Sequence, residues 1–125
     1  QELRGLLETW RDTKRTVTQT IARIISFFPP HQHQEIRYLL ASTLQAIISQ
    51  RLIPDITGTR RYPAVEVMIN SSTIREYIID PEKTVLIRQA IQEGFVQYQM
   101  QTFDQALMHL YKERLVGLEE ALKAS

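Results

Sequence analysis

The sequence contains no cysteine, only four glycines and no long apolar run. The lack of cysteine excludes disulfides, thiolate zinc sites and cysteine nucleophiles, and it fits a reducing compartment such as the cytosol. The longest apolar stretches, residues 24–30 and 39–44, are far shorter than the roughly 20 residues of a membrane-spanning helix. No signal-peptide pattern opens the sequence. We therefore expect a soluble, cytosolic chain.

A marked excess of charge is also missing, since 15 basic residues balance 14 acidic ones to a net charge of +1. Proteins that bind nucleic acid usually carry a clear basic excess or stripe, so no nucleic-acid partner is expected. The length of 125 residues, 43% of them hydrophobic, predicts one domain built on one hydrophobic core.

A phosphate-binding loop is absent as well. Such a loop needs glycines that let backbone N–H groups surround the phosphates, followed by a lysine that reaches their charge. The glycines stand at positions 5, 58, 94 and 117, and none of them precedes Lys-Ser or Lys-Thr. We therefore expect no catalytic and no cofactor-binding residue in this chain, and no hydrolysis of a nucleotide by this chain alone.

Hydrophobic periodicity and turn signals predict several helices. Their ranges are 3–16, 17–28, 36–52, 74–79, 81–94, 103–111 and 118–124. Pro29 and Pro30 end the second of these, because proline lacks the backbone donor that a helix needs. Thr73 with Glu76, and Thr102 with Gln105, have the spacing of a capping box. Asp80 before Pro81 is typical of an N-cap.

A strand is predicted over 62–69, where two sets of residues alternate with the period of two that one buried face requires. The sets are Val65, Val67 and Ile69, and Ala64, Glu66 and Met68. A short strand over 51–56 would pair with residues 63–69 as a hairpin. An isolated hairpin is weak, so helices or a larger sheet must lie beside it. The fold class predicted is mainly helical α+β.

The polar residues offer few candidates for chemistry. His31 and His33 could bind a metal with Glu35 or His109, but the plainer interpretation is a helix start that faces water, and we expect no metal site. The acids Glu66, Asp80 and Asp104 are dispersed, so no pair suggests general acid–base catalysis. Arg60 and Arg61 either contact phosphate or an acidic partner or belong to a solvated loop.

The short helix over 74–79 is unusually apolar, with Ile74, Tyr77, Ile78 and Ile79 among its six residues. These side chains either pack in the core or form a patch that docks on another subunit.

Several stretches together resemble the C-terminal part of the twitching-motility retraction ATPases of type IV pili, which are relatives of the type II secretion motors. They are residues 20–29, 35–53, 63–69, 73–80 and 100–107. The related extension and secretion ATPases usually carry a cysteine-rich zinc insertion, and the absence of cysteine favours the retraction branch. The family's histidine box, by contrast, has no counterpart before Val17. Three explanations stay open: a deletion, a divergent sequence, or a chain joined across missing residues.

Residues 73–80 stand where that family carries Ala-Ile-Arg-Asn-Leu-Ile-Arg-Glu, a motif tied to productive retraction. Ile74, Arg75 and Ile78 match it, whereas Thr73, Glu76, Tyr77, Ile79 and Asp80 differ. The resemblance implies that these eight residues contact a partner and transmit force. A second family-like motif comprises Met100, Gln101, Thr102, Asp104 and Gln105.

The resemblance implies a part of a hexameric RecA-like ATPase ring at the cytoplasmic face of the inner membrane, where platform proteins of the pilus are further partners. Residues 1–16 would form an uncertain N-terminal helix, 17–69 the end of the RecA-like core with a core-strand pair, and 70–125 the helical C-terminal bundle. ATP and Mg²⁺ are implied for the full-length family, with the phosphate loop and catalytic Glu outside this chain.

A different class of function stays open from the sequence. The chain could be a stand-alone, non-catalytic helical interaction module that regulates a pilus or secretion motor. The size of the natural gene product distinguishes the two hypotheses.

Overall fold

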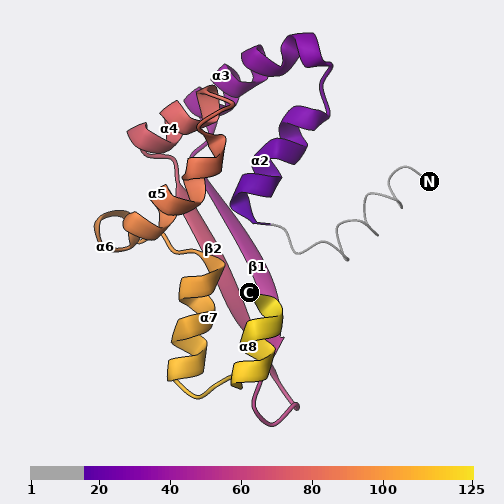
Figure 1. Ribbon diagram of the computed structural model, residues 1–125, viewed down its shortest axis with the longest axis vertical. Helices are drawn as coiled ribbons and strands as arrows, with labels where there is room; N and C mark the ends of the chain where they lie inside the picture. The colour runs from indigo at the N-terminus through magenta and orange to yellow at the C-terminus, as the bar shows by residue number, and fades with distance from the viewer. Residues whose placement is uncertain (1–15) are drawn as a thin grey trace, which may run out of the picture.

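The computed structural model describes residues 16–125, which form a hairpin with helices packed along it (Figure 1). The elements are α2 (Val17–Ser26), η1 (Pro30–Gln32), α3 (His33–Thr43), β1 (Ala46–Pro54), β2 (Arg61–Ile69), α4 (Ser72–Ile79), η2 (Thr84–Leu86), α5 (Ile87–Glu93), α6 (Phe95–Tyr98), α7 (Phe103–Lys112) and α8 (Leu118–Ala124). The mainly helical α+β fold is confirmed. The helix expected over 3–16 lies outside the described residues, apart from Thr16.

The two strands form an antiparallel pair that runs from Ala46 opposite Ile69 to Pro54 opposite Arg61. Along β2, Ala64, Glu66 and Met68 are buried while the residues between them are only half-buried. The helices therefore cover the face of the sheet that carries Glu66 (Figure 1). They supply the additional packing that a two-stranded hairpin needs.

The helix predicted to continue to residue 52 is wrong in its second half. Helix α3 ends at Thr43, and residues 46–54 form β1 instead. The apolar spacing at Leu44, Ile47 and Ile48 fits a helix and a strand equally well, and pairing with β2 along the whole strand decides for β1. The hairpin itself is confirmed, and its first strand is longer than expected.

Two helix starts are as predicted and two are not. Helices α2 and α7 begin at Val17 and Phe103, and the predicted capping box of Thr102 with Gln105 is confirmed. Thr16 forms a second capping box with Gln19, which was not predicted. Helix α4 is capped by Ser71, whose hydroxyl accepts from the Ile74 amide, so the predicted capping box at Thr73 is wrong. Pro81 lies in a turn, and α5 begins only at Ile87, after η2. The end predicted at Gly94 is confirmed.

The core differs from the single cluster expected, because buried apolar residues gather in two. One lies under α2, α4 and α5 and comprises Val17, Ile21, Ile25, Ala41, Met68, Ile74, Ile78, Ile87, Ile91 and Met100. The other lies under α7 and α8 and comprises Ile53, Ala64, Phe103, Ala106, Leu107, Leu110, Val116, Ala121 and Ala124. On β2, Glu66 stands between Ala64 of one cluster and Met68 of the other.

Candidate functional site

The most buried charged group in the described structure joins the two clusters. Glu66 is only 3% exposed, and its Oε1 accepts a hydrogen bond of 2.7 Å from the amide of Val17. Its Oε2 accepts one of 3.1 Å from the amide of Phe103. Val17 and Phe103 are the first residues of α2 and α7, so one carboxylate faces the positive ends of two helix dipoles.

A guanidinium lies beside this carboxylate and binds a third helix end. Arg51 of β1 lies with its Cζ 3.9 Å from the centre of the Phe103 ring. Its Nη1 donates to the carbonyl oxygen of Ala124 at the C-terminal end of α8, which carries a partial negative charge. Burial lowers the pKa of Arg51, and the charges of Glu66 and Asp104 oppose that shift. The junction is thus complementary in charge at all three helix ends.

Helix α4, which carries the motif predicted from the resemblance, is held at its C-terminal end by α3. Arg37 Nη1 donates to the Ile78 carbonyl oxygen and to Thr84 Oγ1, both at 2.9 Å, and Gln34 Nε2 donates to the Ile79 carbonyl oxygen at 3.1 Å. Burial lowers the pKa of Arg37, against the attraction of Asp80. A positive side chain at these carbonyls also complements the helix dipole.

The motif residues on α4 divide between core and surface. Ile74 and Ile78 are fully buried in the cluster under α4, as the core-packing interpretation expected. Arg75 is exposed, and the part of the chain that the structure describes offers its side chain no hydrogen bond or ion pair. Of the three residues that match the retraction motif, only Arg75 therefore presents its side chain to solvent.

The rest of this motif lies around Arg75 and the end of the helix. Thr73 and Glu76 are exposed, and Tyr77, Ile79 and Asp80 are half-buried. Glu76 forms an ion pair of 2.8 Å with Lys83, whose pKa is raised by this hydrogen bond and by the charge of Glu76.

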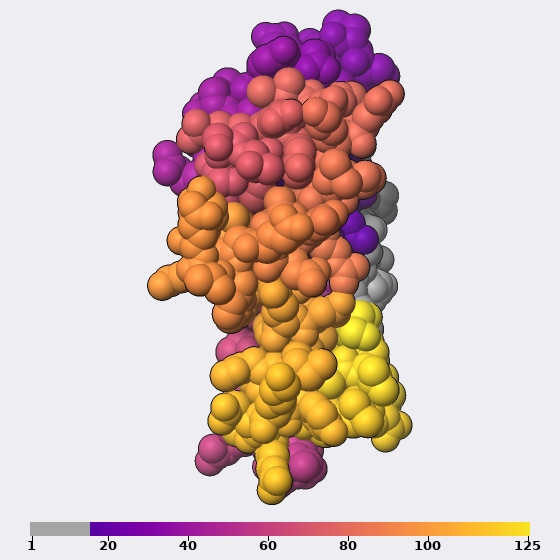
Figure 2. Space-filling view, turned by 60° about the vertical axis from the view of Figure 1, so that its left-hand side comes forward, coloured from indigo at the N-terminus to yellow at the C-terminus, as the bar shows by residue number. Residues whose placement is uncertain are grey.

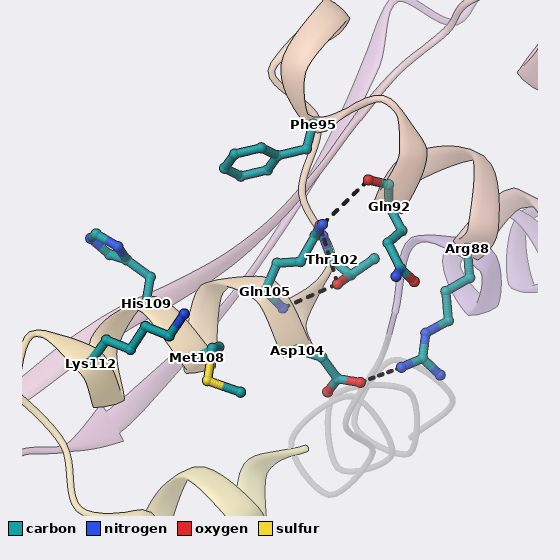
Figure 3. Close-up of a pocket in the computed structure, with 9 residues that line it drawn as sticks. All are labelled: Arg88, Gln92, Phe95, Thr102, Asp104, Gln105, Met108, His109 and Lys112. Atoms are coloured by element: carbon teal, nitrogen blue, oxygen red, sulfur yellow. Dashed lines mark hydrogen bonds and ion pairs between the residues drawn. The ribbon is translucent and has the colours of Figure 1, made fainter.

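A second surface feature is an open pocket of about 470 Å³ between α5 and α7 (Figure 3). It is lined by Arg88, Gln92, Phe95, Thr102, Asp104, Gln105, Met108, His109 and Lys112. An ion pair between Arg88 and Asp104 closes one side, and Gln105 Nε2 donates to the Gln92 carbonyl oxygen at 3.3 Å. These contacts fix the start of α7 against α5.

The second motif predicted from the resemblance forms this corner of the molecule. Thr102 and Gln105 make the capping box of α7, and Met100 is buried in the core. Gln101 pairs with Val67 by two backbone hydrogen bonds of 2.9 and 3.2 Å, and its Nε2 donates to the Val65 carbonyl oxygen at 2.7 Å. The motif thus pairs Gln101 with the outer edge of β2 and fixes the start of α7.

The histidines and acids of residues 16–125 do not gather into a metal-binding group. No group of three or more His, Asp or Glu side chains there could hold a metal ion, and His33 Nε2 donates to the Phe28 carbonyl oxygen at 2.7 Å. The starts of α2 and α7 could otherwise attract phosphate, but Glu66 already occupies both. Within the same range, no helix has the length and apolarity to cross a membrane.

Comparison with curated proteins gives three related pilus proteins, although no protein-family model matches the chain. It is 35% identical over 107 residues to the type IV pilus ATPase PilU of Pseudomonas aeruginosa, covering 83% of this chain and 27% of PilU. It is 36% identical over 106 residues to PilT of the same organism, named a type IV pilus retraction ATPase, covering 85% and 30%. A twitching motility protein of Neisseria gonorrhoeae is 32% identical over 103 residues, covering 82% and 27%.

Two solved structures share the fold of this chain. The pilus retraction motor PilT with bound ADP superposes with a TM-score of 0.71 at 40% identity over 89% of this chain and 30% of that one. The ATPase DotB of Yersinia pseudotuberculosis superposes with a TM-score of 0.74 at 18% identity, over 90% and 28%. At that identity, DotB shows a shared fold alone.

The fold is therefore that of a helical C-terminal subdomain of ATPases such as PilT and DotB. Within that class, the chain is related to the type IV pilus retraction ATPases, and the resemblance stated from the sequence is confirmed. The chain spans 27% to 30% of the length of the curated relatives it matches.

Sequence reasoning missed the junction of Glu66 with Arg51. It assigned Glu66 an ordinary structural role because a single acid in a strand carries no local signal. The partners of Glu66, Val17 and Phe103, are distant in the sequence, so the contact depends on the tertiary fold. The pocket between α5 and α7 was missed for the same reason.

Proposed function

We propose that this chain is the C-terminal portion of a hexameric pilus-retraction motor ATPase and supplies subunit contacts and force transmission. ATP and Mg²⁺ would be bound by residues outside this chain, and the ring would work at the cytoplasmic face of the inner membrane against platform proteins of the pilus. Residues 17–69 would complete the RecA-like core, and 70–125 would form the C-terminal helical bundle.

The exposed side of α4 is the observation that carries this proposal. The two buried isoleucines and the contacts from Arg37 and Gln34 hold the helix rigidly, and Arg75 projects from it into solvent. A rigidly mounted charge can transmit a movement of the subunit to a neighbour, whereas a mobile one would dissipate it. In this proposal Ile74 and Ile78 orient Arg75 instead of contacting the partner, and Thr73, Glu76, Tyr77, Ile79 and Asp80 complete the surface.

The test is Arg75→Ala in the intact motor. Twitching should be lost while ring assembly and ATP hydrolysis persist, because the side chain is exposed and its removal leaves the packing of α4 intact. Arg60→Ala, which removes the same charge from the exposed hairpin loop, is the matched control and should leave motility unchanged. Ile78→Ala is unsuitable, since a cavity in the core costs about 2–5 kcal/mol. Normal twitching with Arg75→Ala would refute the transmission role.

The size of the natural product tests the other half of the proposal. An antibody against this chain should detect a band far above 14.6 kDa, because the catalytic half would be covalently attached. A band at 14.6 kDa would instead support a stand-alone module that regulates a motor.

A further inference from the structure

The open pocket between α5 and α7 has an apolar side and a cationic side. Phe95 and Met108, which are 51% and 53% exposed, supply the apolar side. Figure 2 shows α5 and α6 in orange directly above α7 in amber. Figure 3 shows Phe95, at the start of α6, across the pocket from the side chains of α7. The volume of about 470 Å³ lies within the range of about 300–1,000 Å³ that is usual for ligand pockets.

The charged side chains of this pocket leave one cation without a counterion. Arg88 and Asp104 form an ion pair with each other. Lys112 lines the same pocket, and no acid among residues 16–125 pairs with it. Two cations against one acid, with His109 neutral, give the pocket a net charge of +1. A ligand with a negative charge therefore complements it.

A carboxylate suits this pocket better than a phosphate does. Phosphate sites at a helix start use its free backbone amides. At the start of α7, the amide of Phe103 already donates to Glu66. The amide of Gln105 donates to the Thr102 hydroxyl. The carboxylate of Asp104 also lines the pocket, and it repels a doubly charged phosphate more strongly than a singly charged carboxylate.

The shape of the pocket and the spacing along α7 favour a peptide as the ligand. An open pocket does not bury the roughly 70–90% of its surface that a small ligand usually loses to solvent contact, whereas a peptide needs to place only one or two side chains in it. Met108 and Lys112 are four residues apart on α7, so their side chains are neighbours on one face of the helix. The apolar and acidic residues of the peptide are therefore close in its sequence.

We propose that the pocket between α5 and α7 binds an acidic peptide segment of a partner protein. A glutamate or aspartate of the segment pairs with Lys112, and a neighbouring aromatic or aliphatic side chain lies between Phe95 and Met108. No residue of α4 lines this pocket, so the site is separate from the surface around Arg75. The inference goes beyond the proposed motor role and does not depend on it.

The test is an NMR titration of the isotope-labelled 125-residue chain with the capped tripeptide Glu-Phe-Glu. The amide signals of Phe95, His109 and Lys112 should shift, because these residues line the pocket. Two matched tripeptides, Lys-Phe-Lys and Glu-Ser-Glu, remove the negative charges and the ring in turn. Each should bind about tenfold more weakly. Inorganic phosphate at the same concentration should leave the three signals unchanged.

Variants of the exposed Lys112 test the ion pair without disturbing the core. Lys112→Glu should weaken the binding of Glu-Phe-Glu about tenfold, since attraction becomes repulsion, and Lys112→Arg should preserve it. Arg60→Glu, which makes the same change of charge on the exposed hairpin loop, is the matched control and should bind normally. The proposal is overturned if Glu-Phe-Glu shifts none of the pocket signals, if Lys-Phe-Lys or phosphate shifts them equally, or if Arg60→Glu weakens binding as much as Lys112→Glu.

Discussion

The backbone amides of Val17 and Phe103 donate hydrogen bonds to the two oxygens of a single carboxylate, that of Glu66. Each residue begins a helix, and each helix belongs to a different hydrophobic cluster. The carboxylate therefore satisfies two of the amides that helices leave without internal partners, and it does so where water is excluded. It fixes the cluster under α2, α4 and α5 relative to the cluster under α7 and α8.

Replacing Glu66 by glutamine should lower the free energy of unfolding by about 2 kcal/mol. The amide removes the negative charge from two helix N-termini, and its NH₂ group would face an N–H donor instead of accepting from it. Urea denaturation of the native and variant chains measures the difference. Glu82→Gln, at an exposed turn, is the control and should change stability little. Equal loss in both variants would mean that the buried carboxylate has no special role.

Gly94 should not tolerate a methyl group. A Cβ at this position would lie 2.6 Å from the buried Met100 Cε and 3.2 Å from the Ala90 carbonyl oxygen. Gly94→Ala is expected to lower the free energy of unfolding by about 1–3 kcal/mol, because overpacking displaces Met100 and the end of α5. Chemical denaturation tests it, and an unchanged midpoint would contradict the packing described.

Gly117 provides the opposite case. It is the N-cap of α8 with φ −80° and ψ 161°, and among the described residues no atom lies within 4 Å of a Cβ placed there. Gly117→Ser should raise the free energy of unfolding by about 0.5 kcal/mol, since serine is a better cap and restricts the unfolded chain. A loss of stability in the same denaturation experiment would show that this cap has no room for a hydroxyl.

The hairpin loop should weaken in acid through Asp55. Desolvation raises the pKa of this carboxyl. Hydrogen bonds from the Thr57 hydroxyl and from the amides of residues 58–60 lower it, and together they outweigh desolvation, so the pKa lies below its ordinary value of 3.8. The ionised form is thus favoured by folding, and its contribution is fully present above pH 3.8 and is lost as the pH falls through the folded pKa.

The backbone amides of Thr59 and Arg60 donate to Asp55 Oδ1 at 3.1 and 3.3 Å, so their NMR shifts report on the titration. They should change together with a midpoint below 3.8, and Asp55→Asn should remove the change. A midpoint at or above the ordinary value would show that these bonds do not favour the carboxylate.

The sequence predicted those parts of the fold that depend on neighbouring residues. The capping box at Thr102 and the end of α2 before Pro29 follow from local chemistry, and both are confirmed. Residues 46–52 were predicted as helix because Ile47 and Ile48 fit both periods, and only long-range pairing with β2 decides the matter. The role of Glu66 could not be predicted, because its two partners belong to separate elements.

Gln101 blocks one of the two outer edges of the hairpin. It occupies both backbone groups of Val67 and the carbonyl oxygen of Val65, so the middle of the outer edge of β2 is already filled. In the described part of the chain, the outer edge of β1 pairs with no other strand. A further strand, from the same polypeptide or from another, can therefore extend this sheet beside β1 but not beside β2. Growth of the sheet into a larger one has a single available direction, away from α7 and its capping motif.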